Sequence, residues 1–502
     1  MEVYREHFLK GIVRNVFKKD ATYWERIRKK FAIGLFHRVA DSVPAYKNFL
    51  KDHSVAPDKI KTFEDFLHVP TISKDNYLKN YPLKSLVRGG KINHRFTFTS
   101  TSGSTGEPYY FPRNWQLDQE SSIVHELFLR QAVFQNVPVL IIDGFSMGVW
   151  IGGLITYDAF SLAAHREKMP VSIITTGINK HEILKILTNL SPKFKTTIIT
   201  GYPPFIKDIV DAAQFMKINL KKLNVRLLFA AELFSEKFRD HVSKNAGVSN
   251  VYLDTMNIYG SADIGTMAFE SPLSILIRRL AVGNRSLQKS LFGTTEKLPT
   301  LAQYNPAFIC FQEERGHIVL TGDSGIPLVR YEIGDNGGIL SFEQVLKIGL
   351  DNKFDFLKLA RAERLHDYIY RLPFVFIFER SDFSTTLYGL QIYPETIKLA
   401  LLDRELTRFV TGRFTMVTRY SSKQDQYLEI NIELKEGARV TQIFRKLTLQ
   451  KIINKLRTYN AEFKELHKYL GNRALPKLIF YPKDHIKYFK PGVKQIWTEK
   501  HR

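Results

Sequence analysis

The residues best suited to chemistry form one short segment rich in hydroxyl groups and glycine, Ser100-Thr101-Ser102-Gly103-Ser104-Thr105-Gly106-Glu107-Pro108. Gly103 and Gly106 allow a tight turn whose backbone N–H groups can approach a phosphate oxygen, and the hydroxyls add further donors. The segment lacks the lysine and the spacing of the GxxxxGK[ST] loop. Alone, this composition is also typical of a surface turn, so a phosphate-binding role depends on other motifs.

Four more segments with chemically useful side chains follow in the chain. They are Ala230-Ala231-Glu232, Asn257-Ile258-Tyr259-Gly260-Ser261-Ala262-Asp263, Pro327-Leu328-Val329-Arg330-Tyr331-Glu332-Ile333-Gly334-Asp335 and Glu379-Arg380-Ser381-Asp382. In this order, and together with the hydroxyl-rich loop, they resemble the motifs of the adenylate-forming superfamily. Three further phrases, 43–47, 299–306 and 388–395, resemble its phenylacetate–coenzyme A ligase-like, capsule-biosynthesis-associated branch.

The resemblance implies a role for each matching residue. The nucleotide-binding residues would be Thr101, Ser102, Gly103, Ser104, Thr105, Gly106, Ala231, Glu232, Asn257, Tyr259, Gly260, Ser261 and Asp335. Asp263 would hold Mg²⁺. The catalytic residues would be Lys494, with Lys490 as its rival, and the hinge residues Arg380 and Asp382. In the family, the aromatic residue stacks on adenine, the last aspartate binds the ribose and the C-terminal lysine neutralises charge at the reacting carboxylate.

The implied reaction is ATP-dependent activation of a carboxylic acid. The carboxylate attacks the α-phosphorus of ATP, pyrophosphate leaves, and the acyl-AMP then passes its acyl group to a thiol, coenzyme A first. Positioning and charge neutralisation are the protein's main contributions to such a reaction. The expected cofactors are therefore ATP, Mg²⁺ and coenzyme A, with no zinc.

Several positions depart from the family's pattern. Asp263 stands where glutamate is common, and Glu332 stands where arginine is frequent. Glu379 replaces the glycine before the hinge arginine, and Tyr388 replaces a basic residue before Gly389. The adenylation motifs are intact, so these changes point to the thiol-transfer step or to an unusual acyl acceptor.

The elements that must position these residues alternate between strand and helix. β-Branched runs at 171–175, 196–200 and 225–229 are each followed by a helical pattern, which Asn179, the pair Pro203-Pro204, and Ser235 begin in turn. The repeat predicts an α/β protein in which a large N-terminal domain, residues 1–379, has mostly parallel sheets flanked by helices. A small, mobile α/β C-terminal domain, residues 380–502, would follow. Ligands should bind at the carboxyl ends of the strands, near Gly201, Ala231 and Gly260.

Composition limits the remaining function classes. The 502 residues are 44% hydrophobic and 25% charged, as in globular proteins, and the single cysteine, Cys310, excludes a cysteine-based zinc cluster. The longest apolar stretch, 137–157, contains Asp143 and several glycines, so we expect no transmembrane segment and a cytoplasmic protein. The net charge of +23 favours anionic partners such as coenzyme A or an acidic acyl carrier protein, although a solvated lysine-rich surface explains it equally well. No nucleic-acid module is recognisable.

Two other functions remain open from the sequence. The first is adenylation followed by transfer to a carrier protein or another acceptor, and the second is a catalytically silent nucleotide-binding scaffold. The carboxylic acid itself is not specified by any motif. Phe145, Met147, Trp150 and Tyr202 could line an apolar acid pocket, and ordinary core packing explains them as well.

Overall fold

The computed structural model describes residues 2–92, 95–100, 109–133, 137–148, 152–295, 298–380, 385–489 and 498. For residues 2–5, 379 and 380 it describes the backbone only. The hydroxyl-rich loop from Thr101 to Gly106, Asp382, Lys490 and Lys494 therefore lie outside the described residues. Their expected roles stay predictions.

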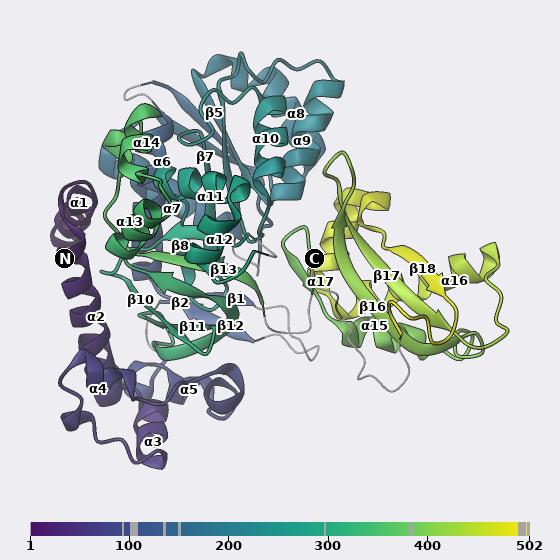
Figure 1. Ribbon diagram of the computed structural model, residues 1–502, viewed down its shortest axis with the longest axis horizontal. Helices are drawn as coiled ribbons and strands as arrows, with labels where there is room; N and C mark the ends of the chain where they lie inside the picture. Colours follow the sequence, from purple (N-terminus) through teal and green to yellow (C-terminus); the bar gives the residue numbers. More distant parts are fainter. Residues whose placement is uncertain are drawn as a thin grey trace.

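One large sheet forms the centre of the N-terminal domain (Figure 1). Its strands are, in spatial order, β10 (Ile309–Glu314), β11 (His317–Gly322), β12 (Leu328–Leu340), β13 (Phe374–Arg380), β9 (Thr300–Gln303), β8 (Gly265–Phe269), β7 (Thr255–Ser261), β6 (Val225–Ala230), β5 (Thr196–Gly201), β3 (Val139–Asp143) and β4 (Val171–Thr175). Pairings from β7 to β4 are parallel, whereas those from β7 to β10 are antiparallel. The sheet is thus mixed, and its parallel half is the part that the strand–helix repeats predicted.

The repeats form where local sequence signals place them. Asn179 caps α8 (Lys180–Asn189) by accepting a hydrogen bond from the backbone N–H of Glu182 at 3.2 Å, and Ser235 caps α10 (Glu236–Ala246) in the same way through Phe238. Pro203 and Pro204 occupy the first turn of α9 (Pro203–Phe215), where their missing N–H groups are not needed. Each βα unit therefore delivers its strand end and the following turn to one edge of the sheet.

Helices cover both faces of the parallel half. They are α6 (Trp115–Ala132), α7 (Gly152–Glu167), α8 (Lys180–Asn189), α9 (Pro203–Phe215) and α10 (Glu236–Ala246), with α11 (Pro272–Gly283), α12 (Arg285–Phe292), α13 (Phe342–Asp351) and α14 (Phe356–Ala362) beside the antiparallel half. Ile199 and Leu227 face the cluster built with α8, α9 and α10, whereas Ile198 and Leu228 face the cluster that includes α6 and α7. Successive strand residues point to opposite faces, so one strand contributes to both cores.

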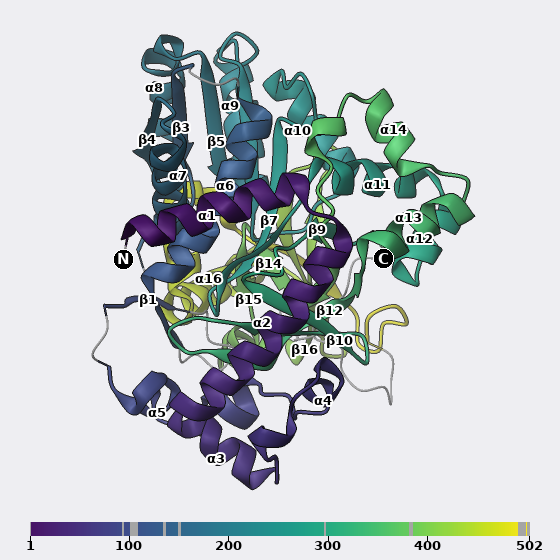
Figure 2. The ribbon, with the colours of Figure 1, turned by 90° about the vertical axis from the view of Figure 1, so that its left-hand side faces the viewer.

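The chain begins with helices that pack on this domain. They are α1 (Glu2–Lys18), α2 (Ala21–Ser42), α3 (Pro44–Asp52), α4 (Phe63–Leu67) and α5 (Leu83–Leu86), followed by the hairpin of β1 (Thr97–Ser100) and β2 (Tyr110–Arg113). Figure 2 shows α1 and α2 running across one side of the large domain. Among the described residues, no helix is long and apolar enough to cross a membrane.

Two smaller sheets, one of two strands and one of three, form the C-terminal domain, which lies beside the large one in Figure 1. Its elements are β14 (Thr385–Leu387), β15 (Leu390–Ile392), α15 (Pro394–Leu401), β16 (Val410–Tyr420), β17 (Gln426–Leu434), α16 (Gln442–Tyr459), α17 (Ala461–Leu470) and β18 (Lys477–Tyr481). The fold class expected from the sequence, a large α/β domain and a small α/β domain, is confirmed. The boundary between residues 379 and 380 stays a prediction, because residues 381–384 lie outside the described part of the chain.

Candidate active site

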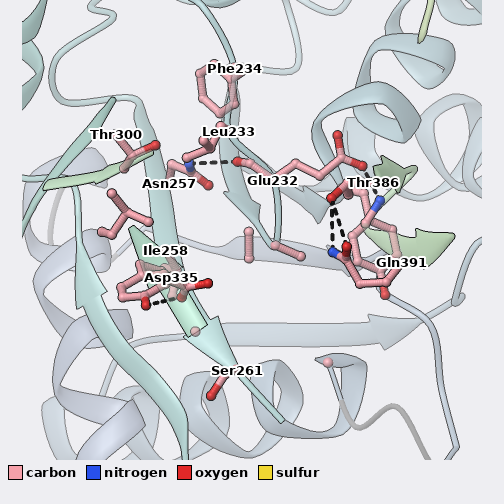
Figure 3. A pocket seen from close by; sticks show the side chains of 18 of the residues that line it. Glu232, Leu233, Phe234, Asn257, Ile258, Ser261, Thr300, Asp335, Thr386 and Gln391 are labelled. Carbon is pink, nitrogen blue, oxygen red and sulfur yellow. Dashed lines mark hydrogen bonds between the residues drawn. The ribbon is translucent and has the colours of Figure 1, made fainter. Parts of the chain in front are cut away.

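A cavity of about 820 Å³ lies between the two domains. The large domain contributes residues at the carboxyl ends of β6 and β7 and from β12, and the small domain contributes residues of β14, β15, β16 and β17. Figure 3 shows Glu232 and Asn257 on the large-domain side, with Thr386 and Gln391 of the small domain opposite. Tyr202, Ala231 and Gly260, in or next to the expected ligand loops, all line this cavity.

The turn after β6 has an unusual backbone conformation. Ala231 has a φ of 73°, in the left-handed region that a side chain with a Cβ atom rarely adopts. The Asn257 side chain, on the neighbouring strand β7, stabilises this turn by donating a hydrogen bond from Nδ2 to the backbone carbonyl of Glu232 at 3.1 Å. Strain of this kind persists only where surrounding contacts determine the conformation, and it is frequent at functional sites.

A buried ion network holds β7 and the 232–236 turn in register. Arg239 is fully buried and binds the carboxylates of Glu270, at 2.7 and 2.8 Å, and Glu236, at 2.9 Å. Glu270 also accepts the backbone N–H of Asn257 at 3.1 Å. Burial opposes ionisation of Glu236, but the guanidinium groups of Arg239 and Arg278 hold its pKa below the usual value. The network fixes the positions of two residues that line the cavity, Glu236 and Asn257.

Two carboxylates of the predicted motifs reach the same cavity, each with a tyrosine partner. Tyr259 donates its hydroxyl hydrogen bond to Asp335 and packs nearly parallel to Phe311, with ring centroids 6.2 Å apart. Asp335 sits at a register shift of β12, an irregularity that redirects a side chain. The hydroxyl of Tyr331 donates to Asp263 at 2.7 Å. The family-based expectation placed these acids in one site, and the geometry brings them together.

Asp263 also faces a cation. The ammonium of Lys74 lies 3.3 Å from the carboxylate of Asp263, and the Asp263 side chain is only 3% exposed. In the described residues, no group of three or more histidine, cysteine, aspartate or glutamate side chains could hold a metal. Mg²⁺ in nucleotide sites commonly takes one or two protein carboxylates together with substrate phosphates, so Asp263 fits such an ion while not building a closed metal site.

Buried polar atoms beside the cavity have no hydrogen-bond partner among the described residues. They include Oδ1 of Asn257 and Oγ of Ser261. Buried polar groups are usually satisfied, and exceptions are concentrated where a ligand or water completes the bonding. Both residues line the cavity, which favours a polar ligand on the β7 side.

The small domain closes the cavity through the tip of the β14–β15 hairpin. The backbone N–H of Gly389 donates to the carboxylate of Glu232, and Nε2 of Gln426 donates to the same carboxylate at 2.7 Å. Burial raises the pKa of Glu232 to about 7 despite these bonds. Burial likewise raises the pKa of Glu462, a cavity-lining residue of α17, to about 7.

Most of the predicted site residues that the structure describes line the cavity. Ala231, Glu232, Asn257, Tyr259, Gly260, Ser261, Asp263 and Asp335 all line the cavity. Ser100, immediately before the hydroxyl-rich loop, lines it as well. Of Arg380 only the backbone is described, paired with Asp335 between β13 and β12. Thr498, the described residue of the chain after Phe489, bridges to Met416 and also lines the cavity.

Sequence reasoning missed Lys74, Glu462 and Gln426. Lys74 begins a short helical turn far upstream of Asp263, and Glu462 lies in the first turn of α17. The local signals at these positions indicate helix starts only. Gln426 is the first residue of β17, and nothing near it in the chain marks it as a partner of Glu232. Their membership of the site depends on contacts between distant segments.

Comparisons with known proteins identify the fold. No protein-family model matches the chain, and no curated protein matches it by sequence. The structure is similar to 2-hydroxyisobutyryl-CoA ligase in complex with 2-HIB-AMP and CoA in the thioesterification state, with a TM-score of 0.62 and 14% identity over 96% of this chain and 91% of that one. The same enzyme in the postadenylation state, with R3-HIB-AMP, gives a TM-score of 0.53 at 14% identity, over 97% and 91% of the two chains. Its open conformation, with 2-HIB-AMP and CoA, gives 0.51 at 14% identity, over 95% and 91%.

The chain therefore shares the fold of 2-hydroxyisobutyryl-CoA ligase along almost its whole length. Residues of three expected motifs, those at 230–232, 257–263 and 327–335, line its cavity together.

Proposed function

We propose that this chain is an adenylate-forming acid–thiol ligase of the phenylacetate–coenzyme A ligase-like branch. It activates a carboxylic acid as acyl-AMP with release of pyrophosphate, then transfers the acyl group to a thiol, coenzyme A first. The observation that carries the proposal is the convergence of Glu232, Asn257, Tyr259, Asp263 and Asp335 on one cavity. The fold supports it independently, because the similar ligase structure contains an acyl-AMP and CoA.

Each cavity residue has a role in this reaction. Asp335 accepts hydrogen bonds from the ribose hydroxyls, and its bond from Tyr259 orients it for that task. The strained turn at Ala231 and the amide of Asn257 form the wall for the base. Lys74 and Asp263 face the polyphosphate, where Lys74 supplies positive charge and Asp263 is the candidate Mg²⁺ ligand. Bound Mg²⁺ would offset the charge of the leaving pyrophosphate.

The hydroxyl-rich loop and the C-terminal lysine complete the proposal from the sequence. The loop starts directly after Ser100, a cavity residue, which is consistent with phosphate binding by Thr101 to Gly106. Lys494 is proposed to stabilise the pentavalent phosphorus during adenylation, and the pair Arg380 and Asp382 to act as the hinge of the small domain. In the second step the thiolate sulfur attacks the acyl carbon, and AMP leaves with the anhydride oxygen.

Pyrophosphate release is the direct test. The full-length chain is incubated with ATP, Mg²⁺ and a panel of aryl-acetic, benzoic, short and long aliphatic acids, and pyrophosphate is measured for each. We expect release with at least one acid class, and formation of its coenzyme A thioester when coenzyme A is added. Acyl-AMP that accumulates in the presence of coenzyme A, and is consumed by an acyl carrier protein, would redirect the second step to a carrier. ATP binding without pyrophosphate release from any acid would overturn the enzyme proposal in favour of a scaffold.

A further inference from the structure

The two domains meet in a second place, next to the cavity, through a cluster of charged and hydroxyl groups. Asp208 of α9 accepts a hydrogen bond from the hydroxyl of Tyr388 at 2.8 Å and one from the guanidinium of Arg473 at 2.6 Å. Tyr388 lies at the tip of the β14–β15 hairpin, and Arg473 follows α17. We call these three residues the latch, since one belongs to the large domain and two to the small domain.

A second ion pair flanks the latch. The ammonium of Lys207, also on α9, lies 2.7 Å from the carboxylate of Asp425, the residue before β17, and the Lys207 side chain is only 1% exposed. Arg473 lies 3.3 Å from the same carboxylate. Burial alone would lower the pKa of Lys207, but the carboxylates of Asp211 and Asp425 raise it, so the charge is retained. Removing one member of a buried charge pair leaves the other unsatisfied, which makes such contacts effective at fixing an arrangement.

The hairpin tip reaches this position at a conformational cost. Tyr388 has a φ of 50° and Gly389 a φ of 82°, so both tip residues are in the left-handed region, where tyrosine is rarely found. Tyr388 is only 1% exposed, and its backbone N–H donates to Gln426 at 2.7 Å. A Cβ atom on Gly389 would lie 2.4 Å from the ring of Tyr202 in the large domain, so the backbone of Gly389 packs against that ring with no room for a side chain. The tip is held in a strained shape against the large domain.

Apolar packing continues through the same region. One buried cluster contains Ile206 and Phe205 of α9 together with Leu387 and Leu390 of the hairpin. The domain arrangement also agrees with a particular catalytic state, because the TM-score to the thioesterification-state ligase, 0.62, exceeds the 0.53 of the postadenylation state and the 0.51 of the open form. The latch therefore belongs to an arrangement that the small domain would leave when it adopts another orientation.

We propose that Asp208, Tyr388 and Arg473 are positioning residues that hold the small domain in the orientation used for thiol transfer. This inference rests on the proposed two-step reaction. It also gives a use to Tyr388, the residue that departs from the basic side chain of the family: its neutral hydroxyl fits between Asp208 and Arg473, with Oη of Tyr388 3.1 Å from the guanidinium. None of the latch residues lines the cavity, so their replacement removes no direct contact to the site of adenylation.

The domain orientation can be measured without substrate. Phe215, 90% exposed at the end of α9, and Ile443, 81% exposed at the start of α16, are replaced by cysteine and spin-labelled. The native Cys310 is fully buried and burial raises its pKa to about 11, so it should not take the label. Double electron–electron resonance then reports the distribution of distances between the domains.

The latch variants are Tyr388→Phe and Arg473→Gln, and the matched controls in the same domain are Tyr469→Phe and Arg457→Gln. Tyr469 is 43% exposed, and Arg457 lies in the last turn of α16 and is exposed; among the described residues, neither has a hydrogen bond or ion pair to α9. Loss of a hydrogen bond to a buried charge should shift the docking equilibrium about tenfold or more towards undocked forms. We expect the controls to keep the wild-type distance distribution.

Kinetics assign the function of the latch. Transfer from preformed acyl-AMP to coenzyme A should fall about tenfold in Tyr388→Phe, with pyrophosphate release unchanged or faster. The double variant Asp208→Asn/Arg473→Gln should shift the docking equilibrium by less than the product of the factors measured for Asp208→Asn and Arg473→Gln alone, because the two residues contact each other.

Three results would overturn the inference in distinguishable ways. Unchanged distances in both latch variants would show that no latch exists, whatever the activity. If the latch variants change the distances between the domains but slow adenylation and thiol transfer equally, the latch has no selective role in transfer. Absence of pyrophosphate release in the wild type would overturn the proposed function and with it the transfer role, while the distances would still decide whether the contact holds the domains together.

Discussion

Glu232 makes the contact between the domains sensitive to pH. The residue is 7% exposed, and its carboxylate accepts hydrogen bonds from the backbone N–H of Gly389 and the side-chain amide of Gln426, both from the small domain. Burial raises the pKa of Glu232 from 4.5 to about 7. When the small domain moves away, the carboxyl group regains water, and its pKa returns towards the lower value. Docking of the domains is therefore linked to uptake of a proton.

The sign and size of the effect follow from this shift. Because the docked form has the higher pKa, it binds more protons than the undocked form between about pH 4.5 and pH 7. The contribution of Glu232 to the free energy of docking is complete at the low end of this window and is lost as the pH rises through about 7. The difference in docking free energy between the two ends of the window is about 3 kcal/mol. For Glu232 alone, docking should be roughly tenfold weaker at pH 8 than at pH 6.

Glu232→Gln is the informative perturbation. Glutamine keeps the size of the side chain and the carbonyl acceptor for Gly389, and it is neutral like the protonated carboxyl group. Spin labels at 215 and 443 report the docked fraction across this pH range in the wild type and in the variant. Between pH 6 and pH 8 we expect the variant to lose the roughly tenfold change in docking that Glu232 contributes, so the pH dependence that remains is that of Glu462, whose pKa burial also raises to about 7.

A matched control separates this effect from general changes in the protein. Glu465, on the same helix as Glu462, has no hydrogen bond or ion pair to the large domain in the part of the chain that the structure describes, so its replacement by glutamine should keep the wild-type slope. If Glu232→Gln shows the same loss of docking with rising pH as the wild type, proton uptake by Glu232 is not the cause. The reasoning from burial would then be wrong.

Three further outcomes are expected. Gly389→Ala should slow thiol transfer at least tenfold while sparing adenylation, because its Cβ would meet Tyr202 and its φ is 82°; single-turnover transfer from acyl-AMP checks this. Asp335→Ala should weaken ATP binding by about 10- to 100-fold, measured by calorimetry, and a change below twofold would remove its ribose role. Lys494→Ala should abolish most pyrophosphate release yet leave transfer from preformed acyl-AMP largely intact; equal losses in both steps would refute that assignment.

Much of the parallel half of the sheet could be predicted from the sequence because its signals are local. The strand expected at 171–175 is β4, and the expected strands at 196–200 and 225–229 extend by one residue each in β5 and β6. Caps such as Asn179 and Ser235 act within one helical turn, so they can be recognised without knowing the fold. The same holds for turns at strand ends, where ligand loops were expected.

The antiparallel half and the sheet order could not be predicted in this way. The strand β9 pairs with β13, which is separated from it in the chain by three strands and two α-helices, and β3 lies between β5 and β4. Such pairings depend on long-range packing. The local pattern of an apolar strand is compatible with several neighbours, and only the complete set of contacts selects one.

The sequence by itself determined which side chains could serve a nucleotide site: the hydroxyl-rich loop, the turn at Ala231, the Asn257–Asp263 segment and Asp335. Their order along the chain was sufficient to anticipate the fold class. Only the tertiary structure decided that Lys74 faces Asp263 and that Glu232 and Asp208 bind the small domain. The physical reason is distance along the chain: hydrogen bonds and ion pairs act over a few ångströms, and folding alone brings such remote residues within that range.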